Sequence, residues 1–181
     1  MPIYHKEPEN DSAATIKRQP YQSFSCSLLH CGPIALYYNK QILENDINKL
    51  VSEQFDIRRL NASIWRSDTS VHEAIQNTLG FPSYYGKNLN ALRDCLSDLD
   101  IADNGGMSIV LTDFDDFSDY NQDFAECMLD IFARSSHRLQ IFGKTLIVMV
   151  HTKDPDASFG NLGAITAWWN TQEFQRNKRI A

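Results

Sequence analysis

The chain has 181 residues, of which 43% are hydrophobic and 22% are charged, a balance typical of one globular domain with room for extensions. Its net charge of −6 argues against nucleic acid as a direct partner. No apolar run approaches the roughly 20 residues that span a bilayer, and the first ten residues lack the apolar core of a signal peptide, so we expect a cytoplasmic protein with no membrane contact.

The first third of the chain contains one clear helix and one clear strand. Residues 1–20 are polar, and residues 21–39 are apolar and aromatic around a Cys-Gly-Pro break, which leaves a hairpin, a strand and a short helix open for them. Apolar residues at helical spacing predict a helix over 42–53. Alternation from Phe55 to Trp65 predicts a strand with an irregular end.

Two helices are expected next. Ser70 and Glu73 match a capping box, which places the first of these helices from Ser70 to the break at Gly80 and Pro82. Leucines repeat every three or four residues over 88–99 and give the second helix one buried stripe. At about 100° per residue, the side of this helix that faces away from the stripe carries Asn90, Asp94 and Ser97, with Asp98 beside them.

The second half of the chain predicts two buried strands with a helix between them. The continuous apolar runs over 108–111 and 145–150 are typical of parallel strands packed on both faces. Helically spaced apolar residues from Tyr120 to Phe132 predict a long helix that ends before Gly143. This order of elements implies a small parallel sheet covered by helices.

The acidic residues concentrate in one stretch, residues 94–133. It holds eleven acidic residues and no lysine or arginine, whereas the rest of the chain holds 17 basic and 12 acidic residues. The negative electrostatic field of so many carboxylates attracts basic partners. The alternative is a solvated surface that only confers solubility. The eleven are Asp94, Asp98, Asp100, Asp103, Asp113, Asp115, Asp116, Asp119, Asp123, Glu126 and Asp130.

The sequence shows no set of residues for catalysis, for a cofactor or for a metal. The five histidines are scattered, and the phosphate-binding glycine motifs are missing. The aspartates of residues 113–119 are spaced like a calcium loop but lack its glycine and terminal glutamate. Four cysteines are expected to be free thiols, as in a reducing cytosol, because no second Cys or His pair completes a zinc site. They are Cys26, Cys31, Cys95 and Cys127.

Residues 81–94, Phe-Pro-Ser-Tyr-Tyr-Gly-Lys-Asn-Leu-Asn-Ala-Leu-Arg-Asp, are the most informative segment. Gly86 permits a positive φ, and Asn88 is a good helix N-cap. Tyr84 and Tyr85 are suited to anchoring an interface. The alternative is a packed corner between helices in which both tyrosines belong to the core.

This segment resembles the signature of the barstar family of ribonuclease inhibitors. The resemblance implies a barstar-like α/β fold, a three-stranded parallel sheet flanked by helices, with N- and C-terminal extensions. It extends over residues 46–152 and leaves 1–45 as an extension of undecided structure. Residues 153–181, with Trp168, Trp169 and Phe174, are expected to pack back on the domain.

The resemblance also implies a non-catalytic, stoichiometric inhibitor that blocks the active site of a basic ribonuclease toxin, as an immunity protein does. The alternative is a regulatory or scaffold module that binds another basic protein. A third possibility is an enzyme that uses Asp94 and a histidine. The residues expected to contact the toxin are Tyr84, Gly86, Asn88 and Asp94, which match contact positions of the family, together with Tyr85, Asn90, Arg93, Ser97 and Asp98 from the same loop and helix.

Three positions depart from the family pattern. Asn90 stands where the family has a second acidic contact, and Arg93 stands where it has an aromatic residue. Arg134 falls about where the family has a contacting glutamate. These departures leave the identity of the toxin open, and whether Arg93 and Arg134 contact it is also open.

Overall fold

A computed structural model describes residues 23–163 and 165–174 of the chain. Its centre is a five-stranded parallel sheet in the order β2-β3-β4-β1-β7, and a separate antiparallel pair, β5-β6, lies outside that sheet. The strands are β1 (Ile34–Tyr37), β2 (Phe55–Asn61), β3 (Gly106–Thr112), β4 (Leu146–His151), β5 (Asn161–Leu162), β6 (Ile165–Thr166) and β7 (Trp168–Trp169).

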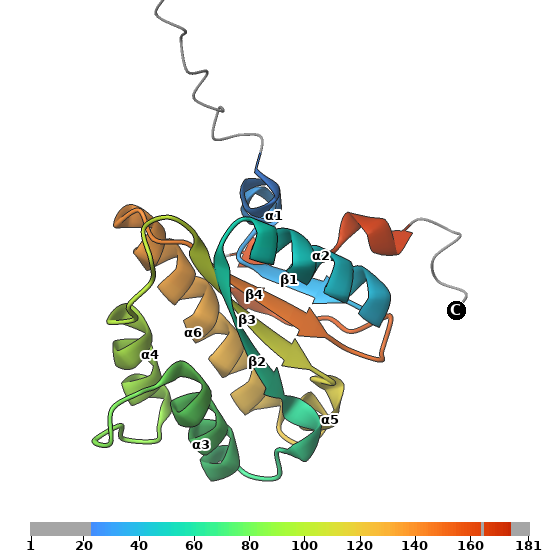
Figure 1. The fold of residues 1–181 in the computed structure, drawn as a ribbon. Helices are drawn as coiled ribbons and strands as arrows, with labels where there is room; N and C mark the ends of the chain where they lie inside the picture. Colours follow the sequence, from blue (N-terminus) through green and yellow to red (C-terminus); the bar gives the residue numbers. More distant parts are fainter. Residues whose placement is uncertain (1–22, 164, 175–181) are drawn as a thin grey trace, which may run out of the picture.

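Helices cover both faces of the sheet and make two separate cores (Figure 1). The smaller core lies under α1 and α2, and the larger core lies under α3, α4, α5 and α6 on the other face. The helices are α1 (Phe24–Cys31), α2 (Lys40–Ser52), η2 (Ala62–Ile64), α3 (Asp68–Leu79), α4 (Leu89–Ser97), α5 (Asp115–Ser118), α6 (Gln122–Ile141) and η3 (Thr171–Phe174). None of the described helices is long and apolar enough to cross a membrane.

The sheet confirms the parallel α/β class but corrects the number of strands from three to five. The three expected strands are β2, β3 and β4, and every residue of β4 is buried, as a strand covered on both faces requires. The two additional strands lie beyond β4. β1 falls in the segment whose structure the sequence left open, and its four residues, all buried, are too few to show a period.

The start of α3 also differs from the expectation. The N-cap is Ser67, whose hydroxyl accepts a hydrogen bond from the Ser70 amide at 3.2 Å, and Ser70 returns the bond by accepting from the Ser67 amide at 3.2 Å. Ser70 is therefore the third helical residue of the capping box rather than its first residue. The expected end is confirmed, because Gly80 follows α3 in the left-handed conformation, with φ 70°.

The segment after β4 returns to the sheet. β7 pairs with β1, so that Trp168 lies opposite Ala35. Beyond β7, the amide of the buried Asn170 donates to the buried carboxylate of Asp46 in α2 at 2.6 Å. The buried Glu173 accepts hydrogen bonds from the backbone amides of Tyr38 and Asn39, which link β1 to α2. Two buried carboxylates therefore hold the C-terminal segment against α2 and β1.

Candidate functional site

The loop between α3 and α4, residues 80–88, is closed by hydrogen bonds at both ends. At the first end, the Pro82 carbonyl accepts from the Tyr85 amide at 3.0 Å and from the side chain of Gln76 at 2.9 Å. At the second end, Asn88 caps α4 by accepting from the Ala91 amide at 2.9 Å, and its side-chain amide donates to the Gly86 carbonyl at 3.0 Å. These hydrogen bonds therefore hold the loop backbone in one conformation at both ends.

The expectation that Gly86 supplies a positive φ is wrong. Besides Gly80, the loop residue in the left-handed region is Lys87, with φ 47°, and its ammonium pairs with Glu73 of α3 at 2.8 Å. Gly86 is needed for space instead. A Cβ there would lie 3.1 Å from the Asn88 side-chain nitrogen and 3.4 Å from the Ala91 methyl group. The absent side chain thus allows the Asn88 cap to form.

The two tyrosines of the loop point in opposite directions. Tyr84 is 86% exposed, whereas Tyr85 is 5% exposed. The Tyr85 ring packs edge-on against Phe81, and its hydroxyl lies 2.5 Å from Nδ1 of the buried His72. Burial raises the pKa of the Tyr85 hydroxyl, so it stays protonated. Of the two tyrosines singled out in the sequence, the structure exposes only Tyr84 to solvent and places Tyr85 beneath the loop.

The buried His72 makes the stability of this corner pH-dependent. Burial lowers the pKa of His72 below its usual 6.5, although Asp68 partly opposes the shift. The unfolded chain then takes up a proton that the folded protein does not, so stability is complete above pH 6.5 and falls as pH drops below it. We expect urea-unfolding free energies to decrease from pH 7.5 to 5.5, by at most about 1.4 kcal/mol per pH unit from this residue. The decrease is expected to be smaller in His72→Gln; an equal slope in both proteins would contradict this assignment.

The outward face of α4 continues the loop surface. Leu92 and Leu96 are buried, and Asn90, Arg93 and Asp94 are exposed. The Asp94 side chain is 72% exposed, and its one ion pair with a described residue is a long one, 3.4 Å to Nε of Arg93. The outward orientation expected for Asn90 and Asp94 from helical spacing is confirmed.

The last turn of α4 completes this face. Ser97 is half-buried and donates its hydroxyl to the Arg93 carbonyl at 2.9 Å. Asp98 follows as the exposed C-cap residue. We call the following set the loop–helix surface: Tyr84, Gly86, Asn88, Asn90, Arg93, Asp94, Ser97 and Asp98.

Arg134 lies on α6, which packs against α4. Its guanidinium pairs with Asp130 at 2.6 Å, and the second oxygen of Asp130 accepts from the Gly163 amide at 2.7 Å. Burial alone would raise the pKa of Asp130, but the hydrogen bonds from Arg134 and Gly163 hold it below the usual value. The positive charge at this position is therefore partly neutralised within the chain.

Much of the acidic stretch is also neutralised. Six of its eleven carboxylates form ion pairs within 4.0 Å, with cations that lie outside the stretch in sequence. These carboxylates are Asp94, Asp103, Asp113, Asp115, Asp116 and Asp130. The negative electrostatic field of residues 94–133 is consequently weaker than their composition indicates.

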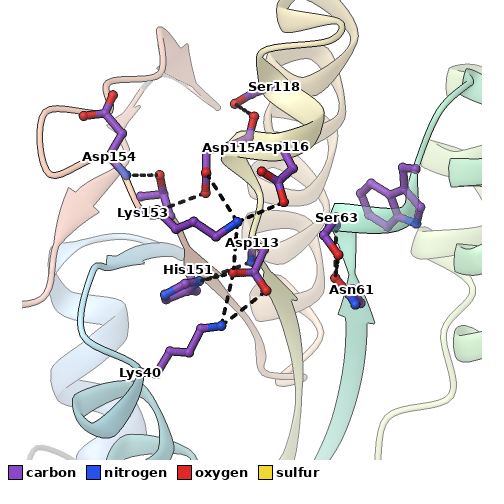
Figure 2. A network of polar contacts seen from close by, with 12 residues as sticks. Lys40, Asn61, Ser63, Asp113, Asp115, Asp116, Ser118, His151, Lys153 and Asp154 are labelled. Carbon is purple, nitrogen blue, oxygen red and sulfur yellow. Dashed lines mark hydrogen bonds and ion pairs between the residues drawn. The ribbon is translucent and has the colours of Figure 1, made fainter.

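The densest of these clusters joins the carboxyl ends of β3 and β4 (Figure 2). Lys153 lies 2.9 Å from Asp116 and 3.6 Å from Asp113, and Lys40, the first residue of α2, approaches Asp113 at 3.2 Å. The Asp113 amide donates to Nδ1 of the buried His151. Across the described residues, no three or more His, Cys, Asp or Glu side chains are arranged to hold a metal. The aspartates that are spaced like a calcium loop thus form ion pairs that link the ends of β3 and β4 to the start of α2.

A family model, a curated protein and a solved structure are similar to parts of the chain. A family model described as "Barstar (barnase inhibitor)" matches residues 55–151, from the start of β2 to the end of β4. The "Putative ribonuclease inhibitor YrdF" of Bacillus subtilis (strain 168) is 30% identical over 78 residues, which are 42% of this chain and 81% of that protein. A chain of the solved "Structure of Drosophila ORC bound to AT-rich DNA and Cdc6" aligns with a TM-score of 0.48 and 12% identity, over 72% of this chain and 43% of that one.

Proposed function

Because the chain belongs to the barstar family, we propose that it is a protein inhibitor of a basic ribonuclease, with the loop–helix surface placed over the active site of the enzyme. The partner we propose is a ribonuclease toxin bound in a 1:1 complex, which would make the chain a non-catalytic immunity protein. The family match and the similarity to the "Putative ribonuclease inhibitor YrdF" support the inhibitory role; the toxin is our extension of it.

The observation that carries the proposal is the placement of Asp94. It stands on a rigid helix whose other face is locked into the core, and its carboxylate is open to solvent. A ribonuclease must hold a phosphodiester among cationic side chains, and a fixed carboxylate can pair with the same groups. In this position Asp94 occupies the place of a substrate phosphate, while Tyr84 supplies exposed aromatic area on the neighbouring loop.

The two loop tyrosines are expected to affect different properties. Tyr84→Ala should weaken ribonuclease binding by about 2 kcal/mol or more, as loss of an aromatic anchor does, and change folding stability by less than about 0.5 kcal/mol. Tyr85→Ala should cost about 3–5 kcal/mol of stability, because it empties a core site and leaves His72 without its partner. Calorimetric titration and urea unfolding of both variants measure this separation. Equal effects of the two changes on stability would contradict it.

The association rate is expected to fall as salt rises. The chain carries a net charge of −6, and a basic ribonuclease is attracted over a distance that salt reduces to about 8 Å at physiological ionic strength. Since half or more of the acidic stretch is already paired within the chain, the salt dependence should be moderate. Stopped-flow rates that stay flat from low to high salt would show that this region does not steer the partner.

Capture of the enzyme tests the proposal. Immobilised full-length protein should retain a ribonuclease from a lysate of its own organism, detected by cleavage of a fluorogenic RNA after elution. A column of the Asp94→Ala variant is the matched control and should retain much less of this activity. Retention of ribonuclease by neither column, or equally by both, would contradict the proposed site.

A further inference from the structure

A groove lies beside the loop–helix surface, between α4, α6 and the segment that leads into β5. It has a volume of about 350 Å³. The groove is lined by Leu89, Glu126, Cys127, Asp130, Ile131, Gly160 and Leu162. Gly160 and Leu162 lie beyond residues 55–151, so the C-terminal segment builds one wall of the groove.

The lining combines an apolar base with two carboxylates. Leu89, Ile131 and Leu162 provide the apolar part, and Glu126 and Asp130 project from successive turns of α6. On Glu126, Oε1 accepts from Gln122 at 3.0 Å, whereas no described residue is hydrogen-bonded to Oε2. The groove therefore offers a carboxylate oxygen above an apolar surface.

The C-terminal segment keeps this carboxylate accessible. A Cβ at Gly160 would lie 3.3 Å from Glu126 Oε2, so a larger residue there would crowd the oxygen. The Gly163 amide holds Asp130 from the other side, at 2.7 Å. Asp130 already binds one guanidinium, that of Arg134, at 2.6 Å. Both oxygens of Asp130 are therefore occupied, and among the described residues Glu126 Oε2 is the carboxylate oxygen of the groove that remains for an incoming guanidinium.

We propose that this groove receives an arginine side chain of the ribonuclease, as a second anchoring point at the edge of the loop–helix surface, on the side of α4 that carries Leu89. The inference rests on the proposed function. Leu89 follows the Asn88 cap directly and lies one helical turn before Arg93, so the groove is continuous with the loop–helix surface. An arginine has an apolar stem for the leucine and isoleucine side chains. Its planar, weakly hydrated guanidinium pairs with carboxylates better than a lysine ammonium does.

A small probe tests the groove without the ribonuclease. Nα-acetyl-arginine methylamide is titrated into the 15N-labelled full-length protein and followed by NMR. Saturable shifts are expected at Cys127, Ile131 and Leu162, and none with Nα-acetyl-norleucine methylamide. Glu126→Gln should weaken probe binding at least threefold, and Cys127→Trp, which fills the groove from an exposed position, should abolish it. Absence of saturable shifts at the groove would overturn the inference, whatever the ribonuclease does.

The ribonuclease retained by the immobilised protein supplies the second test. Glu126→Gln and Cys127→Trp should each weaken its binding at least tenfold. Asp123→Asn removes the same charge from an exposed residue of α6 outside the groove lining and should change binding less than twofold. Equal effects of Asp123→Asn and Glu126→Gln, or none from either groove variant, would overturn the inference and leave the inhibitor role intact. If no ribonuclease is retained, the proposed function fails, and this inference fails with it, even where the arginine probe binds.

Discussion

Asp94→Ala is expected to weaken ribonuclease binding by about 2–5 kcal/mol, a loss of roughly thirtyfold or more in affinity. Removal of the carboxylate leaves cationic groups of the enzyme buried in the interface without a counter-charge, and charge pairs of this kind have been measured at the barnase–barstar interface. Folding stability should change by less than about 0.5 kcal/mol, because the side chain is 72% exposed and its ion pair with Arg93 is long. Calorimetric titration and urea unfolding give the two quantities.

Glu44→Ala is the matched control. Glu44 is a half-buried residue whose side chain is 44% exposed, and its carboxylate has an arginine partner, Arg59, as Asp94 has Arg93. It lies on α2, which covers the opposite face of the sheet. This variant should bind the ribonuclease like the wild type. Loss of affinity in Glu44→Ala equal to that in Asp94→Ala would mean that overall charge, rather than the loop–helix surface, determines binding.

Asp46→Ala is expected to have the opposite pattern, with a loss of about 3–5 kcal/mol in folding stability. The Asp46 carboxylate is fully buried and accepts from Tyr37, Asn170 and Gln172 while it pairs with Lys49 at 2.7 Å. Its removal leaves the buried hydroxyl of Tyr37 and the buried amide of Asn170 without this acceptor, each at a cost of about 1–3 kcal/mol. The C-terminal segment should then detach more readily from α2 and β1.

Urea unfolding of Asp46→Ala measures this loss of stability, and Glu44→Ala on the same helix is the control. An exposed ion pair such as Glu44–Arg59 is worth about 0.2–1 kcal/mol, so the two variants should differ several-fold in their loss of stability. Hydrogen exchange at the β1 and β7 amides should increase in Asp46→Ala only. Equal stability of the two variants would show that the buried network does not hold the C-terminal segment.

The sequence predicted those parts of the fold that depend on local patterns. Continuous apolar runs identified β3 and β4, and leucine spacing identified the buried side of α4. Burial of one or both faces of an element gives its apolar residues a regular spacing in the sequence. The two-residue strand β7 is too short to show such a spacing. It exists only because β1 offers it a partner, and that pairing joins residues more than 130 positions apart.

The features of the candidate site also differ in whether local sequence determines them. The N-cap role of Asn88 and the outward direction of Asp94 follow from local spacing and could be predicted. The burial of Tyr85 could not, because it depends on His72 in another helix. The neutralisation of the acidic stretch was missed for a similar reason. Four of the six paired carboxylates take their cations, Lys40, Lys144 and Lys153, from distant positions that only the folded chain brings together.

Titration of the retained ribonuclease with the purified chain tests the central claim most directly. Cleavage of a short RNA should fall linearly and reach zero at one equivalent of wild-type protein, with excess RNA substrate restoring activity in the early phase of mixing. The Asp94→Ala variant should leave substantial activity at the same ratio. Full RNA cleavage in the presence of excess wild-type protein would contradict the claim that this chain inhibits the enzyme by covering its active site.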